Sequence, residues 1–282
     1  MAQRLVIEAG RSERQYWHDL WRYRELFAFL AWRDLLIRYK QTAVGVAWSL
    51  FRPFLTMLVL TLMMKVSKLP GDGASPLALF VYTAMLPWQF FSTALSESGN
   101  SLINNSNLIS KVYFPRLVVP ASSVITSFVD FAIAALFTIL MMAWCRFMPP
   151  WHLVFLPIFV LLTFGVSFGV GLWIAALMVK YRDFRFIVPF MVQFGLYATP
   201  VFVMTAHIPE KWVWHNVELP ARLLYSLNPV VGIIDGFRWC ILGGANVLYW
   251  PGLISSAIVV VILVWSGLWY FRKTERTFAD LI

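Results

Sequence analysis

Six long runs of apolar residues constrain what this chain can fold into more than any other feature. A helix that crosses the hydrocarbon core of a bilayer needs about 20 mostly apolar residues. Six segments meet that need: residues 43–64, 77–96, 117–145, 151–179, 186–206 and 251–271. Charged residues make up only 13% of the chain, about half the share found in soluble domains. The sequence therefore predicts an all-α integral membrane protein with six transmembrane helices.

The distribution of lysine and arginine predicts the orientation of these helices, because six spans place both termini on one side. On that side lie residues 1–42, 97–116, 180–185 and 272–282, and on the other lie residues 65–76, 146–150 and 207–250. The first set carries 16 of the 23 lysine and arginine residues, and the second set carries 6. Cytoplasmic segments are enriched in these residues, so we expect both termini in the cytoplasm. The net charge of +9 then follows membrane topology and does not indicate nucleic-acid binding.

The N-terminal segment, residues 1–42, is followed by the six-span domain at 43–271 and a short tail at 272–282. Arg22 and Glu25 lie on one face of a helix in this segment. The opposite face carries the apolar residues Leu20, Tyr23, Leu26, Phe27, Leu30 and Ala31. This pattern predicts an amphipathic helix that lies in the membrane surface.

The segment between the fifth and sixth spans, residues 207–250, contains a shorter apolar stretch. Residues 223–234 hold no charge, but 12 residues suit a re-entrant helix better than a span. Asn228-Pro229 would interrupt a helix within this stretch, which a re-entrant hairpin tolerates when protein surrounds it. We therefore expect 207–250 to form an outer cap that dips into the membrane.

Several kinds of chemistry are missing from the sequence. There is no Asp-x-Asp pair for a membrane transferase and no Gly-x-x-x-x-Gly-Lys-[Ser/Thr] loop for ATP. His207/Glu210 and His215/Glu218 repeat a His-x-x-Glu spacing that zinc can use, but Pro209 disrupts the helical spacing, so no metal site is expected. Without an ATP site of its own, the chain would need another polypeptide to bring ATP.

The segment from Asn100 to Pro120 is polar and rich in asparagine, although it lies between two spans. Its apolar residues can form one stripe on a short helix that ends at Pro115, namely Leu102, Leu108, Ile109, Val112 and Tyr113. A short helix with apolar and amide surface suits docking into a groove on another protein. The alternative is an ordinary solvated loop.

Five ordered motifs give the chain a resemblance to a known family. They are RDLLIRYKQTAVGVAWSLFRPFL (33–55), LPWQFF (86–91), NSLINNSNLISKVYFPRLVVP (100–120), KYRDFRFIVPF (180–190) and LNPVVGIIDGFR (227–238). Together, from about Trp21 to Arg276, the chain resembles the Wzm-like permease subunits of type-2 ABC exporters for O-antigen, capsule or teichoic acid. The resemblance implies a homodimer with two P-loop ATPase subunits, which would carry ATP and Mg²⁺, and no cofactor in this chain. It also implies the cytoplasmic membrane of a bacterium as the location.

The resemblance also implies roles for particular residues. A coupling helix at about 100–113 and the loop at 180–185 would contact the ATPase through Asn100, Asn104, Asn107, Leu108, Lys111, Arg116, Arg182 and Asp183. A lipid pyrophosphate would be received by Arg33, Arg38, Lys40 and Arg52. Aromatic residues along the channel would be Trp88, Phe90, Phe91, Phe194 and Tyr197, since aromatic rings stack on sugar faces. An outer gate would involve Trp212, Trp214, Asn228 and Pro229.

The implied substrate is a lipid-linked polysaccharide, and three alternatives stay open. A permease of the same fold would export a drug, haem or a small lipid. A stand-alone membrane transferase would need clustered acidic residues, which are missing. A secondary carrier would need intramembrane carboxylates in a relay, and the acids near the spans, Glu97, Asp130 and Asp183, are scattered among different segments.

Overall fold

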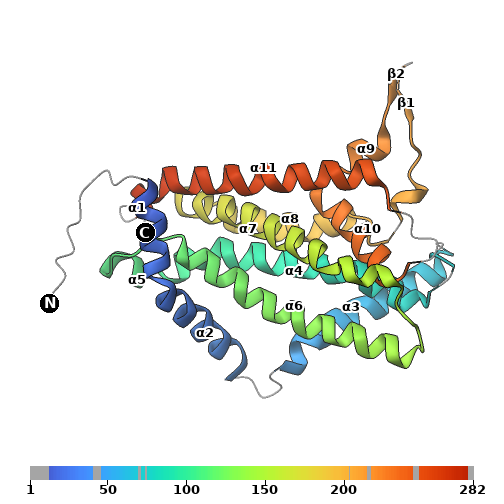
Figure 1. Cartoon of the computed structure of the whole chain (residues 1–282), viewed down its shortest axis with the longest axis horizontal. Coiled ribbons are helices and arrows are strands. Elements are labelled where there is room, and N and C mark those ends of the chain that lie inside the picture. Colours follow the sequence, from blue (N-terminus) through green and yellow to red (C-terminus); the bar gives the residue numbers. More distant parts are fainter. Residues whose placement is uncertain are drawn as a thin grey trace.

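The computed structural model describes residues 13–40, 46–68, 71–73, 75–202, 204–214, 217–243 and 248–278. Long helices run roughly side by side along the long axis of the molecule (Figure 1). The helices before the third predicted span are α1 (Glu13–Arg22), α2 (Arg24–Lys40), α3 (Val46–Val66), α4 (Leu77–Asn104) and α5 (Ser106–Lys111). Those that follow are α6 (Val118–Trp144), η1 (Trp151–Phe155), α7 (Leu156–Lys180), α8 (Phe184–Tyr197), η2 (Thr205–His207), α9 (Ala221–Tyr225), α10 (Pro229–Ile241), α11 (Trp250–Thr274) and η3 (Glu275–Thr277).

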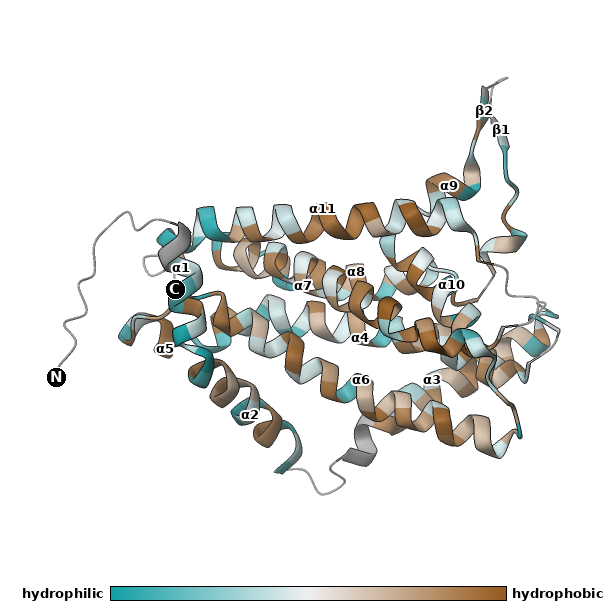
Figure 2. Ribbon diagram, viewed as in Figure 1, coloured by the Kyte–Doolittle hydropathy of each residue, from teal (hydrophilic) through white to brown (hydrophobic). Residues whose placement is uncertain are grey.

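Four helical segments of the described chain are long and apolar enough to cross a membrane. They are Leu77–Asn104, Val118–Trp144, Trp151–Lys180 and Trp250–Thr277. Two more predicted spans are represented by shorter apolar helices, Pro53–Val66 within α3, and α8. Figure 2 shows apolar residues along these helices and hydrophilic residues gathered where α1, α5 and the end of α11 meet. The prediction of an all-α, multi-pass membrane protein is confirmed.

Helix α4 lies at the centre of the bundle. Eighteen of its 28 residues are buried, because α6 and α7 pack on it over most of its length and α3, α8 and α10 pack on the rest. The main core cluster includes Phe80, Tyr82 and Phe90 from α4 and Phe237 from α10. The central position of α4 explains why its sequence is less apolar than that of the outer helices, since protein rather than lipid surrounds most of it.

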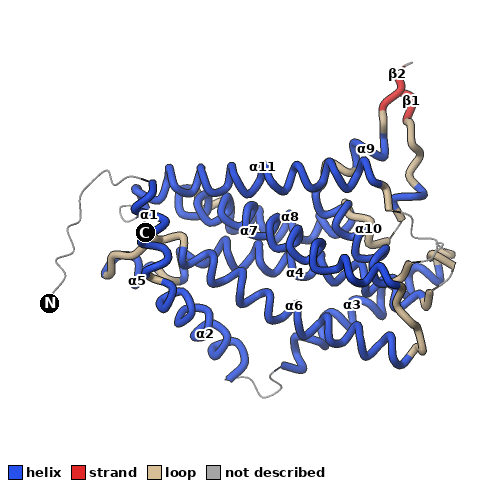
Figure 3. The backbone as a smooth tube through the Cα atoms, viewed as in Figure 1, coloured by secondary structure: helices blue, strands red, loops and turns tan. Residues whose placement is uncertain are grey.

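Residues 207–250, which the sequence predicts to lie outside and which we call the outer segment, include the short helices α9 and α10 and a two-stranded antiparallel hairpin, β1 (Trp212–Trp214) and β2 (Val217–Leu219), drawn in red in Figure 3. Helix α10 begins where the sequence predicts an interruption: the Asn228 side chain accepts a hydrogen bond from the Val230 N–H (3.2 Å), and Pro229 is the first helical residue. This is a standard helix start. The helix break predicted at Asn228-Pro229 is therefore confirmed.

The N-terminal apolar stripe faces the protein. Leu30 and Ala31 are buried, and the other four residues pack against a second core cluster, which contains Leu117, Phe271 and Phe278. Other aromatic side chains of α1 and α2 are exposed instead, namely Trp17, Trp21, Phe29 and Trp32. The apolar stripe thus packs on the end of α11 and the start of α6, and the location of this helix in the membrane surface stays a prediction.

Helices α7 and α11 approach closely at glycines of α7. A Cβ atom at Gly169 would lie 2.7 Å from backbone atoms of Leu263 and Val264, whereas a Cβ at Gly165 would lie 2.9 Å from a methyl group of Val260. A single methyl group can shift more easily than the backbone of a packed helix, which cannot move without shifting its neighbours.

The substitution Gly169→Ala is expected to lower the free energy of unfolding by about 1–3 kcal/mol, the usual cost of overpacking. The matched substitution Gly165→Ala is expected to cost less than Gly169→Ala, because its contact is a single methyl group of Val260 and the better helix propensity of alanine offsets part of the rearrangement. Thermal unfolding of the purified chain in detergent compares the two variants. Equal melting temperatures for both would contradict this account of the α7–α11 contact.

Candidate functional site at the α5 end

One end of the bundle, here called the α5 end, brings together α1, α5 and the end of α11 (Figure 1). The coupling helix expected at 100–113 is shorter in the structure, because α4 continues to Asn104 and a separate helix, α5, covers only Ser106–Lys111. Asn105 separates the two helices, and its side-chain amide donates to the Ser101 carbonyl at 2.8 Å. Asn100 and Asn104 therefore belong to the last turns of α4.

Helix α5 has an inward and an outward face. Ile109 is buried and Leu108 is half-buried, and both contact the second core cluster. Exposed side chains follow on the other face and just beyond it, at Asn107, Lys111, Val112 and Tyr113. The inward residues fix α5 on the bundle, and the outward residues offer an amide, a cation, an apolar side chain and an aromatic ring to solvent or to another protein.

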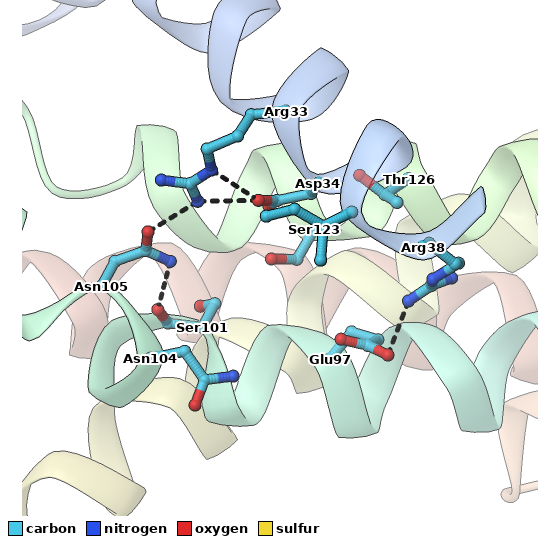
Figure 4. A pocket seen from close by; sticks show the side chains of 10 residues that line it. Arg33, Asp34, Arg38, Glu97, Ser101, Asn104, Asn105, Ser123 and Thr126 are labelled. Carbon is cyan, nitrogen blue, oxygen red and sulfur yellow. Dashed lines mark hydrogen bonds and ion pairs between the residues drawn. The ribbon is translucent and has the colours of Figure 1, made fainter. Parts of the chain in front are cut away.

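An arginine of α2 holds the residue that precedes α5. The Arg33 guanidinium lies 2.7 Å from Asp34 and donates a second hydrogen bond, also 2.7 Å, to the Asn105 side-chain oxygen (Figure 4). Because Asn105 is the junction of α4 and α5, this contact ties the junction to α2. The side chains of Arg33 and Asp34 are partly exposed, so solvent screens part of the interaction between them.

A second arginine of α2 joins three helices. The Arg38 guanidinium lies 2.6 Å from Glu97 of α4 (Figure 4) and also pairs with Asp130 of α6. The hydroxyl of Tyr39 donates a hydrogen bond to the other oxygen of Asp130. The arrangement gives both carboxylates a partner where the end of α2 meets the last third of α4 and the middle of α6. Sequence reasoning named Arg38 but missed its acidic partners.

These contacts surround a pocket of about 520 Å³ between α2, α4 and α6. It is lined by Arg33, Asp34, Ile37, Arg38, Glu97, Ser101, Asn104, Asn105, Ser123 and Thr126. Two of the three arginines predicted to receive a pyrophosphate, Arg33 and Arg38, reach this pocket, but each already pairs with a carboxylate. An anion would have to displace those acids. Lys40 is exposed at the end of α2, and the side chain of Arg52 lies outside the described part of the chain.

A third arginine holds the chain just after α5. The Arg116 guanidinium donates a hydrogen bond to the Glu275 carbonyl at the end of α11. The Glu275 carboxylate accepts a hydrogen bond from the Tyr16 hydroxyl at 3.0 Å, and the Arg272 guanidinium lies 3.7 Å from the centre of the Tyr16 ring. Burial and the neighbouring Glu275 raise the pKa of Tyr16, so the phenol stays protonated. Helix α5 is thus held on both sides, by Arg33 before it and Arg116 after it.

The remaining predicted contact residues and aromatics lie in different environments. Arg182 and Asp183 are exposed in the turn between α7 and α8. Trp88 and Phe90 are buried among other side chains, and the Phe90 ring packs against the rings of Phe128, Phe131 and Phe164. Their predicted channel role is therefore corrected to core packing.

Two of the predicted aromatics are exposed. Phe194 and Tyr197 are exposed on α8, and Phe91 is half-buried against Trp88. In the outer segment, Trp212 is exposed on β1, and the side chain of Trp214 lies outside the described part. Asn228 and Pro229 start α10. Among the described residues, no group of three or more His, Cys, Asp or Glu side chains is arranged to hold a metal ion.

Comparison with known proteins agrees with this architecture. Residues 25–242 match the family described as ABC-2 type transporter. The O-antigen export system permease protein RfbA of Myxococcus xanthus is 29% identical over 265 residues, which cover 94% of this chain and 98% of that protein. Two proteins of the same name from Klebsiella pneumoniae are 25% and 28% identical, and each alignment covers 92% of this chain and 95% of the relative. Since the family match includes α2 through α10, the chain belongs to the ABC-2 type transporter family.

Proposed function

We propose that this chain is the permease subunit of an ATP-driven exporter that moves a lipid-linked polysaccharide of the O-antigen type across the cytoplasmic membrane. The names of the relatives support the substrate class. The observation that carries the proposal is α5, a short helix anchored by its inner face, with an exposed outer face at one end of a membrane bundle. Transport, rather than catalysis, is the activity that the family supports.

The partner that we propose for α5 is a P-loop ATPase subunit. Two copies of each subunit would form the exporter, with ATP and Mg²⁺ bound by the ATPase and no cofactor in this chain. Closure of the ATPase dimer would push on α5. The contacts of Asn105 and Arg116 on its two sides would pass that movement to α2 and α11. Coupling of this kind requires that the contacts of α5 in one conformational state of the exporter differ from its contacts in the other state.

The topology that we propose has six spans, with α3 and α8 added to the four long helices. Both termini and the α5 end would then be cytoplasmic, in agreement with the excess of lysine and arginine there. Residues 1–42 would form a cytoplasmic segment, 43–271 the transmembrane domain and 272–282 a tail. Helices α9 and α10 would form the re-entrant outer cap at 207–250.

Deletion of the gene for this chain in its own cells tests the proposed function. We expect the loss of surface polysaccharide, the accumulation of lipid-linked polysaccharide inside the cell, and restoration of both by the wild-type chain. Blots of surface glycan and extraction of the lipid-linked pool measure these effects. Unchanged surface glycan together with altered sensitivity to drugs or haem would favour a small-molecule exporter of the same fold instead.

Substitutions on the outward face of α5 and just beyond its end test the proposed coupling. Asn107→Glu and Tyr113→Ala change exposed side chains, so we expect the fold to persist while ATPase recovered with the purified chain falls at least tenfold. Trp212→Ala, an exposed aromatic at the opposite end of the bundle, is the control and should leave recovery unchanged. ATP hydrolysis by the purified complex is the measurement. Wild-type hydrolysis by both α5 variants would argue against α5 as the contact.

A further inference from the structure

Helix α4 carries a polar stripe among its half-buried residues. Between Leu79 and Leu102, every residue of α4 is buried except Gln89, Phe91, Thr93, Ser96, Glu97 and Asn100. Four of these, Gln89, Thr93, Ser96 and Asn100, are separated by three or four positions, and so share one face of the helix. We call these four residues the α4 stripe. Its length corresponds to roughly 16 Å of helix.

The other long helices expose different side chains. Their exposed residues in the middle of the bundle are apolar, including Leu136, Ile139 and Leu140 on α6, Leu161 on α7, and Ile254, Ile258 and Ile262 on α11. Such faces suit contact with lipid. Amide and hydroxyl groups without hydrogen-bond partners are strongly disfavoured in hydrocarbon. The α4 stripe therefore faces water or a polar ligand, and not lipid.

The hydrogen-bonding capacity of the stripe is only partly used within the chain. The Ser96 hydroxyl donates to the Ser92 carbonyl at 3.0 Å, and the Asn100 amide donates to the Ser96 carbonyl at 2.9 Å. These bonds leave the side-chain oxygens of Ser96 and Asn100 able to accept. The side chains of Gln89 and Thr93 make no hydrogen bond with the other described residues. All four groups are uncharged.

The stripe is continuous with the pocket at the α5 end. Glu97 and Asn104 lie at the edge of the stripe on the helix surface and also line that pocket. Glu97, the only charged residue of α4, is paired with Arg38. On neighbouring α8, which packs on α4, the exposed rings of Phe190, Phe194 and Tyr197 share one face. Uncharged hydrogen-bonding groups on one helix and aromatic rings on its neighbour are the combination that suits a neutral sugar chain, and they bring no positive charge to a pyrophosphate.

We propose that the α4 stripe is the surface on which the uncharged part of the glycan forms hydrogen bonds during its passage, starting from the pocket. The inference rests on the proposed export function, and a second copy of the chain would close the open side of the path. Amides and hydroxyls suit movement because each bond to a sugar hydroxyl replaces one to water, and its net strength is small. Successive sugars can exchange partners along the stripe, whereas a row of charges would hold them.

Cysteine accessibility tests whether the stripe faces water. Cys145 and Cys240, the only cysteines, are replaced by serine and alanine, and single cysteines are introduced at Thr93 and Ser96 or, as controls, at Ile258 and Ile262. A membrane-impermeant methanethiosulfonate reagent is applied to vesicles that contain the complete complex. We expect the stripe positions to react at least tenfold faster than the controls. Equal rates, or direct disulfide cross-linking of Ser96 positions between two copies, would overturn the inference, because the stripe would then face lipid or a closed interface.

Apolar substitutions of similar size test whether the stripe contacts the glycan. The triple variant Gln89→Leu/Thr93→Val/Ser96→Ala is expected to slow the appearance of surface glycan at least tenfold, with unchanged ATPase association. Thr138→Val, a buried threonine of α6, is the matched control and should keep the wild-type rate. If the wild-type chain itself moves no glycan, the proposed function fails. If the wild-type chain exports glycan and the folded triple variant does so at the same rate, only the role of the stripe fails.

Discussion

Replacing Arg38 with glutamine is expected to lower the free energy of unfolding by about 2 kcal/mol and to loosen α2 from the bundle. The substitution leaves Glu97 and Asp130 without their shared cation. The side chains of Arg38 and Asp130 are 23% and 21% exposed, so the effect should lie between the small value of a surface pair and the value of about 3–5 kcal/mol for a broken buried pair. Thermal unfolding in detergent should show a decrease of roughly 5 °C in the midpoint.

Two further variants identify the cause of that loss. Lys40→Gln removes the same charge from an exposed position on the same helix, and its melting temperature should match the wild type. Arg38→Gln/Asp130→Asn removes the cation together with one of its acids, and should recover part of the lost stability because one unpaired carboxylate is gone. A double variant that melts no higher than Arg38→Gln would show that the ion pair is not what holds α2.

The partners of Arg38 explain why this site could be predicted only in part. Arg38, Glu97 and Asp130 each stand out in the sequence as charges near apolar spans, but they are 59 and 92 positions apart. Nothing in local sequence says which helices become neighbours. In the sequence, Arg38 belongs to a basic cluster, and Glu97 and Asp130 are two scattered acids. Only the packing of the helices shows that the three side chains pair with one another. The same limit applies to Arg116 and Glu275.

In contrast, structural features that depend on only a few neighbouring residues could be predicted from the sequence. The start of α10 at Asn228-Pro229 follows from a side chain that caps the helix and a proline that needs no N–H partner. Long apolar runs likewise predicted α4, α6, α7 and α11. Which side of a span faces the core is a tertiary property, so Phe90 and Phe194 could not be separated by sequence: one is buried and the other is exposed.

A buried arginine in the outer segment forms another contact between distant parts of the chain. Arg238 of α10 is 1% exposed, and its guanidinium donates hydrogen bonds to the carbonyls of Pro200 and of Val201, the latter at 2.9 Å. Its central carbon lies 3.9 Å from the centre of the Phe80 ring on α4. The chain after α8 forms no regular helix or strand at these residues, so its carbonyls need a donor from elsewhere. One side chain thus holds α10, the end of α8 and α4 together.

Replacement of Arg238 by methionine, which keeps most of the length but removes every donor, is expected to lower the free energy of unfolding by about 3–5 kcal/mol. Lysine should be intermediate, because an ammonium group can reach one carbonyl but lacks the planar pair of donors. The recovered amount of monodisperse protein and its melting temperature in detergent measure both effects.

Arg222 of α9 offers a matched control for this substitution. Its guanidinium also donates to loop carbonyls, those of Ala206 and Ile208, but its side chain is 18% exposed, and water can replace some of the lost donors. Arg222→Met should therefore cost about 1 kcal/mol, less than either substitution at Arg238. If Arg222→Met and Arg238→Met are equally destabilising, burial is not what makes Arg238 important. If instead Arg238 dominates, its buried hydrogen bonds to the carbonyls of Pro200 and Val201 are what holds α10 against the chain that follows α8.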